Sequence, residues 1–225
     1  MIQFKDYKMH ILAFVVSIGI MFGSMHLWIL TIASPVFIFL VFHFLKVWKT
    51  KQRLLLGVPA IIIGVILFFL VFSYSVANMP TGSFENDDLK ATISPFSTSN
   101  MNAKFNVTVV YGDITNHTLG YEVKDMYSEL VIERSEVVGN VTGNSTVFSF
   151  SLDLPQGIYN ITFKVENSTL SISAIKEDPM SLFSIYVMGS GIYLSLLLSA
   201  LYSLLIFGIH VMRKGYKMGA AYGRK

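Results

Sequence analysis

Three long stretches without a charged residue constrain this chain more than any other feature. They cover residues 9–45, 54–76 and 182–212, with lengths of 37, 23 and 31 residues. An α-helix of roughly 20 apolar residues crosses the ~30 Å hydrocarbon core of a bilayer. Hydrophobic residues make up 53% of the chain and charged residues only 14%, which is too apolar for an ordinary soluble domain. The sequence therefore predicts an α-helical multi-pass membrane anchor.

The first stretch is too long for one span, because a single helix of this length would extend about 55 Å at 1.5 Å per residue. We predict a transmembrane helical hairpin over residues 9–45, with two spans and a turn near 23–26. A turn at Ser34–Pro35, a re-entrant first segment and a cleaved signal peptide remain as alternatives. With transmembrane helices over 54–77 and 181–212, the hairpin makes four spans.

Basic clusters border the apolar stretches and predict their orientation, because Lys and Arg concentrate on the cytoplasmic side of membrane proteins. We predict a cytoplasmic amino terminus over 1–8, a cytoplasmic loop over 46–53 and a cytoplasmic tail over 213–225. The clusters consist of Lys5 and Lys8; Lys46, Lys49, Lys51 and Arg53; and Arg213, Lys214, Lys217, Arg224 and Lys225. Anionic lipid headgroups account for these charges, so we expect the lipid bilayer as a partner and no nucleic acid.

The polar segment between the last two spans has a different composition. Residues 78–180 hold 13 acidic and 6 basic residues, whereas the rest of the chain has 11 basic residues and one acidic residue, Asp6. Six of the ten asparagines in this segment begin an Asn-x-Thr triplet, the N-glycosylation acceptor of exported proteins. These are Asn106, Asn116, Asn140, Asn144, Asn160 and Asn167. We therefore predict a glycosylated extracytoplasmic domain.

The chain has no cysteine, so disulfides, thiol chemistry and cysteine metal sites are excluded. Many acceptor triplets in the absence of any disulfide favour an archaeal cell surface over an animal one.

Apolar and polar residues alternate with a period of two from residue 101 onward, as in half-buried strands. The apolar positions are Phe105, Val107 and Val109; Leu130 and Ile132; Phe148, Phe150 and Leu152; Tyr159, Ile161, Phe163 and Val165; and Leu170 and Ile172. Turn residues separate these runs. We predict an all-β antiparallel sandwich ectodomain over 101–178, joined to the third span by an extracytoplasmic linker over 78–100.

The stretch Leu154-Pro155-Gln156-Gly157-Ile158-Tyr159 resembles the turn into a late strand of many immunoglobulin-like extracellular modules. This resemblance implies an immunoglobulin-like architecture and no particular activity.

The same alternation places the sugar acceptors. Residues i and i+2 of a strand face the same side, so the register that buries Phe105 exposes Asn106 and Thr108. The register that buries Tyr159 exposes Asn160 in the same way. The remaining acceptors with a predicted environment, Asn140, Asn144 and Asn167, are expected in turns.

Small residues recur every four positions in the last span, where they form one stripe on a helix: Gly191, Ser195, Ser199 and Ser203. Gly19 and Gly23 make a second pair in the first stretch. Helices in lipid associate through small residues that allow close backbone approach. We predict helix packing at both places, either among the spans of this chain or in a homodimer or membrane-protein complex formed through the last helix.

We predict no catalytic, cofactor-binding or metal-binding residues and no enzymatic activity. A nucleophile elbow and a phosphate-binding glycine loop are absent from the sequence. Asp113 and His117 are four residues apart, but a metal site needs three or four convergent ligands. The spans contain histidines but no Asp, Glu, Lys or Arg, which argues against an ion relay.

Two hypotheses for the function remain. The first is a multi-pass membrane protein that displays the glycosylated sandwich for extracellular binding of protein or carbohydrate, or for interaction with the cell envelope. The second is a non-catalytic accessory subunit of a larger membrane complex of the transporter or secretion type.

Overall fold

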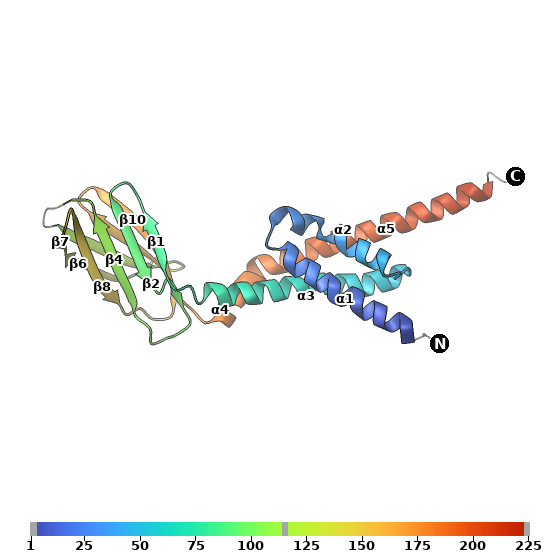
Figure 1. The fold of residues 1–225 in the computed structure, drawn as a ribbon, viewed down its shortest axis with the longest axis horizontal. Helices are drawn as coiled ribbons and strands as arrows, with labels where there is room; N and C mark the ends of the chain where they lie inside the picture. Colours follow the sequence, from blue (N-terminus) through green and yellow to red (C-terminus); the bar gives the residue numbers. More distant parts are fainter. Residues whose placement is uncertain (1–3, 114–116, 223–225) are drawn as a thin grey trace. The chain divides into compact units, whose positions relative to one another are not determined.

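The computed structural model of this protein describes residues 4–113 and 117–222. The chain separates into two compact units (Figure 1). Residues 1–71 and 184–225 form one unit, which we call the helical unit, and residues 72–183 form the other, which we call the two-sheet domain.

The helices follow the apolar stretches. They are α1 (Phe4–Ser24), α2 (Trp28–Phe44), α3 (Thr50–Val76), α4 (Pro179–Tyr186) and α5 (Ile192–Tyr222), with one π-helical segment (Val187–Gly191) between the last two. Among the described residues, three helical segments are long and apolar enough to cross a membrane: Tyr7–Ser24, Thr50–Val76 and Pro179–Gly215. The apolar helix Ile29–Phe44 is shorter. At 1.5 Å per residue it extends only about 25 Å, so a fourth crossing stays a prediction.

Close backbone approach holds the helical unit together. A Cβ atom added to Gly64 on α3 would lie 2.6 Å from the Cβ of Met21 on α1. A Cβ added to Gly57 would overlap the ring of Tyr202 on α5. The Tyr202 hydroxyl also donates a 3.0 Å hydrogen bond to the backbone oxygen of Arg53. A larger residue at Gly64 would collide with the first atoms of the Met21 side chain, and one at Gly57 would require the Tyr202 ring to move.

In its described residues, the second unit has ten strands in two five-stranded sheets. The first sheet has the order β1 (Gly82–Glu85), β2 (Leu89–Ser94), β4 (Phe105–Tyr111), β8 (Ser145–Leu152) and β7 (Asn140–Thr142). The second has the order β3 (Ser97–Thr98), β10 (Ser168–Lys176), β9 (Gly157–Val165), β5 (Thr118–Asp125) and β6 (Val131–Val138). Only the short pair β3–β10 is parallel, and the other pairs are antiparallel.

Both sheets contribute to one hydrophobic core. In β4, Phe105, Val107 and Val109 are buried and Asn106 is exposed, as the alternation predicts. The ring of Tyr121 on β5 stacks on Phe150 on β8, with 4.6 Å between the ring centroids. The prediction of a helical part together with antiparallel-rich sheets is thus confirmed.

Residues 78–100, for which the sequence predicts a linker, contain the strands β1, β2 and β3. Leu89, Ala91 and Ile93 of β2 are almost fully buried in the core. The alternation in this strand covers only six residues, and acidic and turn residues surround it, which is why composition alone indicates a linker.

The two ends of the two-sheet domain are held next to each other. The backbone oxygen of Met79 accepts hydrogen bonds of 3.1 Å from the amides of Phe96 and Ser97. The oxygen of Phe96 in turn accepts a 3.2 Å bond from the amide of Ile175, near the end of β10. The Ser97 hydroxyl donates to the backbone oxygen of Val76. The short strand β3 therefore ties the entry of the chain to its exit.

Candidate functional site

Every sugar acceptor in the described part of the chain is exposed. Asn106 and Asn160 lie on the outer faces of β4 and β9, and so belong to different sheets. Asn144 and Asn167 lie in the β7–β8 and β9–β10 turns, as predicted. Asn140 was predicted in a turn but begins strand β7, because residues 140–142 pair with the start of β8.

The sixth predicted acceptor, Asn116, lies outside the described residues.

The threonines of the triplets differ in accessibility. Thr142 and Thr169 are exposed. Thr146 is fully buried, and its hydroxyl donates a 2.9 Å hydrogen bond to the backbone oxygen of Asp113. The triplet that begins at Asn144 therefore has a threonine with a structural role in the folded domain as well.

The start of the edge strand β6 and the turn before it carry an apolar surface that the sequence did not predict. Alternation assigned Leu130 and Ile132 to the core, but they are 65% and 43% exposed. We call this surface the β6 patch, and it consists of Met126, Tyr127, Leu130, Val131 and Ile132. An edge strand has a partner on one side only, so half of its backbone hydrogen-bonding groups face outward. Alternation cannot distinguish such an edge from a central strand.

Polar residues line a shallow groove of about 300 Å³ beside this edge, on β5, β6 and β9. Glu122 forms ion pairs with Arg134 and Lys124 there. The Tyr121 hydroxyl donates a 2.5 Å hydrogen bond to Glu133. Desolvation, followed by this hydrogen bond, raises the pKa of Tyr121 to about 12. Tyr121 is therefore a neutral donor at physiological pH and carries no charge for acid–base chemistry.

His117 lies between two carboxylates. Its Nε2 is 3.2 Å from Asp113 and its Nδ1 is 3.0 Å from Glu166, while its ring meets Tyr111 edge-on. The sequence indicated the Asp113–His117 pair, but Glu166 comes from the distant β9–β10 turn. Among the residues that the structure describes, no group of three or more His, Cys, Asp or Glu side chains is arranged to hold a metal ion.

The two small-residue stripes have different surroundings. Gly191 is buried against α3, where an added Cβ would lie 3.1 Å from the ring of Phe69. Ser195, one turn later, is also buried, and the Ser203 hydroxyl donates to the backbone oxygen of Ser199 within α5. At Gly19 and Gly23 an added Cβ would meet nothing within 4 Å. These last two glycines border an open apolar groove between α1 and α2.

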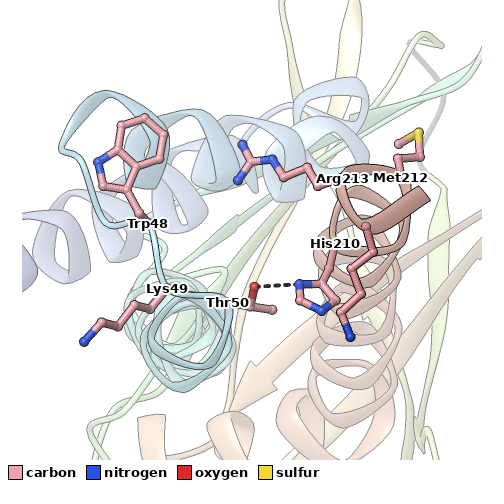
Figure 2. Close-up of a pocket in the computed structure, with 7 residues that line it drawn as sticks. Trp48, Lys49, Thr50, His210, Met212 and Arg213 are labelled. Carbon is pink, nitrogen blue, oxygen red and sulfur yellow. Dashed lines mark hydrogen bonds between the residues drawn. The ribbon is translucent and has the colours of Figure 1, made fainter. Parts of the chain in front are cut away.

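A pocket with a volume of about 810 Å³ lies in the helical unit (Figure 2). It is lined by Trp48, Lys49, Thr50, His210, Met212, Arg213 and Lys214. Figure 2 shows the Thr50 hydroxyl facing Nδ1 of His210, at 3.3 Å, and Lys49 directed away from this pair. A smaller adjoining cavity of about 30 Å³ shares several of these residues and is also lined by Arg53.

Comparison with protein-family models gives no match for this chain, and comparison with curated proteins gives no significant relative.

Proposed function

We propose that this protein is a multi-pass membrane protein that displays a glycosylated, immunoglobulin-like β-sandwich outside the cell and binds an extracellular partner through it. The observation that carries the proposal is the distribution of acceptors. All five described acceptor asparagines are exposed, they occur on both sheets, and the helical unit has no asparagine at all. A surface that receives sugars at several faces must be exported.

The helical unit has the surface expected of a protein in lipid. Ile29 is 83% exposed, and Leu55 and Phe44 are each 75% exposed. Soluble monomers rarely expose contiguous apolar areas above a few hundred Å². The buried hydroxyls of Ser17 and Ser34 donate to backbone oxygens of their own helices, at 2.6 and 2.7 Å. Such internal pairing is needed where water is absent.

The strand order supports the immunoglobulin-like architecture. The order β2-β4-β8-β7 corresponds to strands A-B-E-D of such sandwiches, and β10-β9-β5-β6 corresponds to G-F-C-C′. The hydroxyl of Tyr159, near the start of β9, donates to the backbone oxygen of Pro155, in the manner of the tyrosine corner of strand F. The chain departs from antibody domains because it has no cysteine for the disulfide between the sheets.

The sidedness of the chain follows from the basic residues. Lys and Arg near the ends of the apolar helices favour the cytoplasm, so both termini are cytoplasmic and the sandwich is extracytoplasmic. With the amino terminus inside, the pair α1–α2 must cross twice or not at all.

The β6 patch is the surface that we assign to the partner. No acceptor triplet falls between residues 119 and 139, so the β6 patch itself carries no sugar acceptor. Aromatic residues and Met, here Tyr127 and Met126, are enriched in the centres of protein interfaces. An exposed edge strand also offers backbone groups for strand addition. The expected partner is therefore a protein of the cell envelope or cell surface.

Two experiments test this proposal. Glycan mapping and protease accessibility on intact source cells should find sugars at Asn106 and Asn160 and cleavage within the sandwich. Asparagines without sugars, in a domain that the protease cleaves only after the membrane is broken, would contradict the proposed orientation.

For binding, the full-length protein in lipid nanodiscs is added to source-cell envelopes. Leu130→Asp should weaken binding at least about tenfold, or about 1.4 kcal/mol. The matched control is Val141→Asp, on β7 of the other sheet, where the side chain is 44% exposed. Equal weakening in both variants would remove the β6 patch as the site.

The alternative, an accessory subunit of a membrane complex, is favoured by the open groove beside Gly19 and Gly23. It predicts that a membrane protein co-purifies stoichiometrically in mild detergent and is lost on Gly19→Leu. Loss of the partner on Leu130→Asp, with retention in Gly19→Leu, would favour the display function.

A further inference from the structure

Arg53 has an environment that differs from that of the other basic residues near the start of α3. Its side chain is only 3% exposed, whereas Lys49 and Lys51 are exposed. The Nε atom donates a 2.5 Å hydrogen bond to the backbone oxygen of Val47, and the guanidinium lies 4.9 Å from the centroid of the Phe39 ring. Among the described residues, its Nη2 atom is buried and has no hydrogen-bond partner.

A buried guanidinium without an anionic partner is costly, since both the charge and the unpaired N–H groups lose their hydration. The chain itself offers little compensation. Asp6 is the only acidic residue in the segments that form the helical unit. The compensating anion is therefore expected from outside the chain.

The cavity next to Arg53 is built from cationic and hydrogen-bonding groups. Arg53 and Arg213 both line the small cavity, together with His210 and Thr50. Lys214 lines the adjoining larger pocket. Helix α3 begins at Thr50, and the free N–H groups of a helix amino terminus favour an anion. Two guanidinium forks are the donors that match the oxygens of a phosphate group.

We propose that this pocket binds a phosphate group, with Arg53 and Arg213 as its principal ligands. Two sources of the same chemistry are possible: the phosphate of an anionic lipid headgroup, and free inorganic phosphate. The small cavity beside Arg53 shares lining residues with the larger pocket of about 810 Å³. The combined site therefore has room for more than the phosphate alone. The lipid source rests on the proposed membrane location, whereas binding of inorganic phosphate does not.

The experiment uses the full-length, delipidated protein with Trp28→Phe, so that Trp48 in the pocket wall is the one remaining tryptophan. Trp48 fluorescence is followed during titration with inorganic phosphate, and separately with nanodiscs of phosphatidylglycerol or phosphatidylcholine. A saturable change with inorganic phosphate identifies the free anion as sufficient. A saturable change with phosphatidylglycerol only identifies the lipid headgroup.

The variants separate a site from general charge attraction. Arg213→Gln, at an exposed position, should weaken binding about tenfold or more. Lys51→Gln makes the same change in charge within one helical turn of Arg53, but Lys51 does not line the pocket. The affinity of this variant for the phosphate ligand should therefore stay within twofold of the unsubstituted protein. Arg53→Gln should abolish saturation, with helix content checked by circular dichroism.

Equal losses in Arg213→Gln and Lys51→Gln would overturn the proposal, as would the absence of saturation with both ligands. If the protein proved to lie outside membranes, the phosphate titration would still test the site on its own.

Discussion

The Tyr159 hydroxyl donates a 2.8 Å hydrogen bond to the backbone oxygen of Pro155. Tyr159 is 1% exposed and lies near the start of β9, while Pro155 precedes the turn that leads into this strand. The bond therefore fixes the path of the turn against the core. A Cβ added to Gly157 would lie 2.8 Å from the same hydroxyl, so the turn has room for glycine only.

Removal of this hydroxyl should destabilise the two-sheet domain. Tyr159→Phe keeps the ring but loses the hydrogen bond, at a cost of about 1 kcal/mol. The measurement is urea unfolding of the full-length protein in detergent, followed by near-ultraviolet circular dichroism. Tyr127→Phe is the control, since this side chain is 68% exposed. Equal stability of the two variants would contradict a structural role for the Tyr159 hydroxyl.

Stability of the two-sheet domain should fall between about pH 10 and pH 12. Desolvation raises the pKa of Tyr121 and of Tyr159 to about 12, with further contributions from the Glu133 hydrogen bond and the Asp125 charge respectively. In the unfolded chain both ionise near pH 10. The contribution of these two residues to the free energy of unfolding is thus complete below pH 10. It is lost as the pH rises towards 12, and it is on the order of 2 kcal/mol for each residue.

Urea unfolding at several alkaline pH values, with absorbance at 295 nm, measures this loss. Tyr121→Phe and Tyr159→Phe should each make the dependence on pH shallower. The same steep dependence in both variants would assign the loss to other groups.

Two threonines of the acceptor triplets should respond differently to alanine. Thr146→Ala removes a buried hydroxyl bonded to the backbone of Asp113, so it should cost about 1–2 kcal/mol as well as the glycan on Asn144. Thr169→Ala, at an exposed position, should remove the glycan that we propose for Asn167 with little change in stability. Intact mass and urea unfolding measure the two effects.

Asn144→Gln separates the loss of the glycan from the loss of the threonine, because it keeps Thr146. A stability as low as that of Thr146→Ala would show that the glycan, rather than the buried hydroxyl, stabilises this turn.

The close approach of α1 and α3 is testable with a larger residue at the contact. Gly64→Leu adds side-chain atoms where a Cβ already lies 2.6 Å from the Cβ of Met21, so it should lower the free energy of unfolding by about 1–3 kcal/mol. The measurement is thermal unfolding of the full-length protein in detergent. Gly19→Leu is the control, since nothing lies within 4 Å of a Cβ at Gly19, and equal stability of the two variants would contradict the packing of α1 on α3.

Hydropathy and alternation predict which segments of this protein form helices and strands. They do not predict which of these segments lie next to each other. The uncharged stretches indicate where apolar helices lie, and Phe105, Val107 and Val109 show the burial that their spacing predicts. The environment of Leu130 could not be predicted, because its exposure depends on which strand ends the sheet. A local pattern carries no information about that order.

The basic residues near the start of α3 show the same limit at the candidate phosphate site. In the sequence, Lys51 and Arg53 belong to one cluster that predicts orientation only. In the structure, Lys51 is exposed and Arg53 is buried. The Arg53 side chain bonds to the backbone of Val47, and residues of α5 that are distant in the sequence, such as Ile206, line the same cavity. No spacing rule identifies such a partner.

The joining of chain entry and exit by β3 has an evolutionary consequence. Because the backbone of Phe96 bonds both to Met79, which precedes β1, and to Ile175, near the end of β10, the points where the chain enters and leaves the sheets lie close together. A different domain with the same spacing between its ends could replace this one while the apolar helices kept their sequence. Under the proposed display function, exchange of the domain would change the exposed surface and leave the membrane spans unaltered.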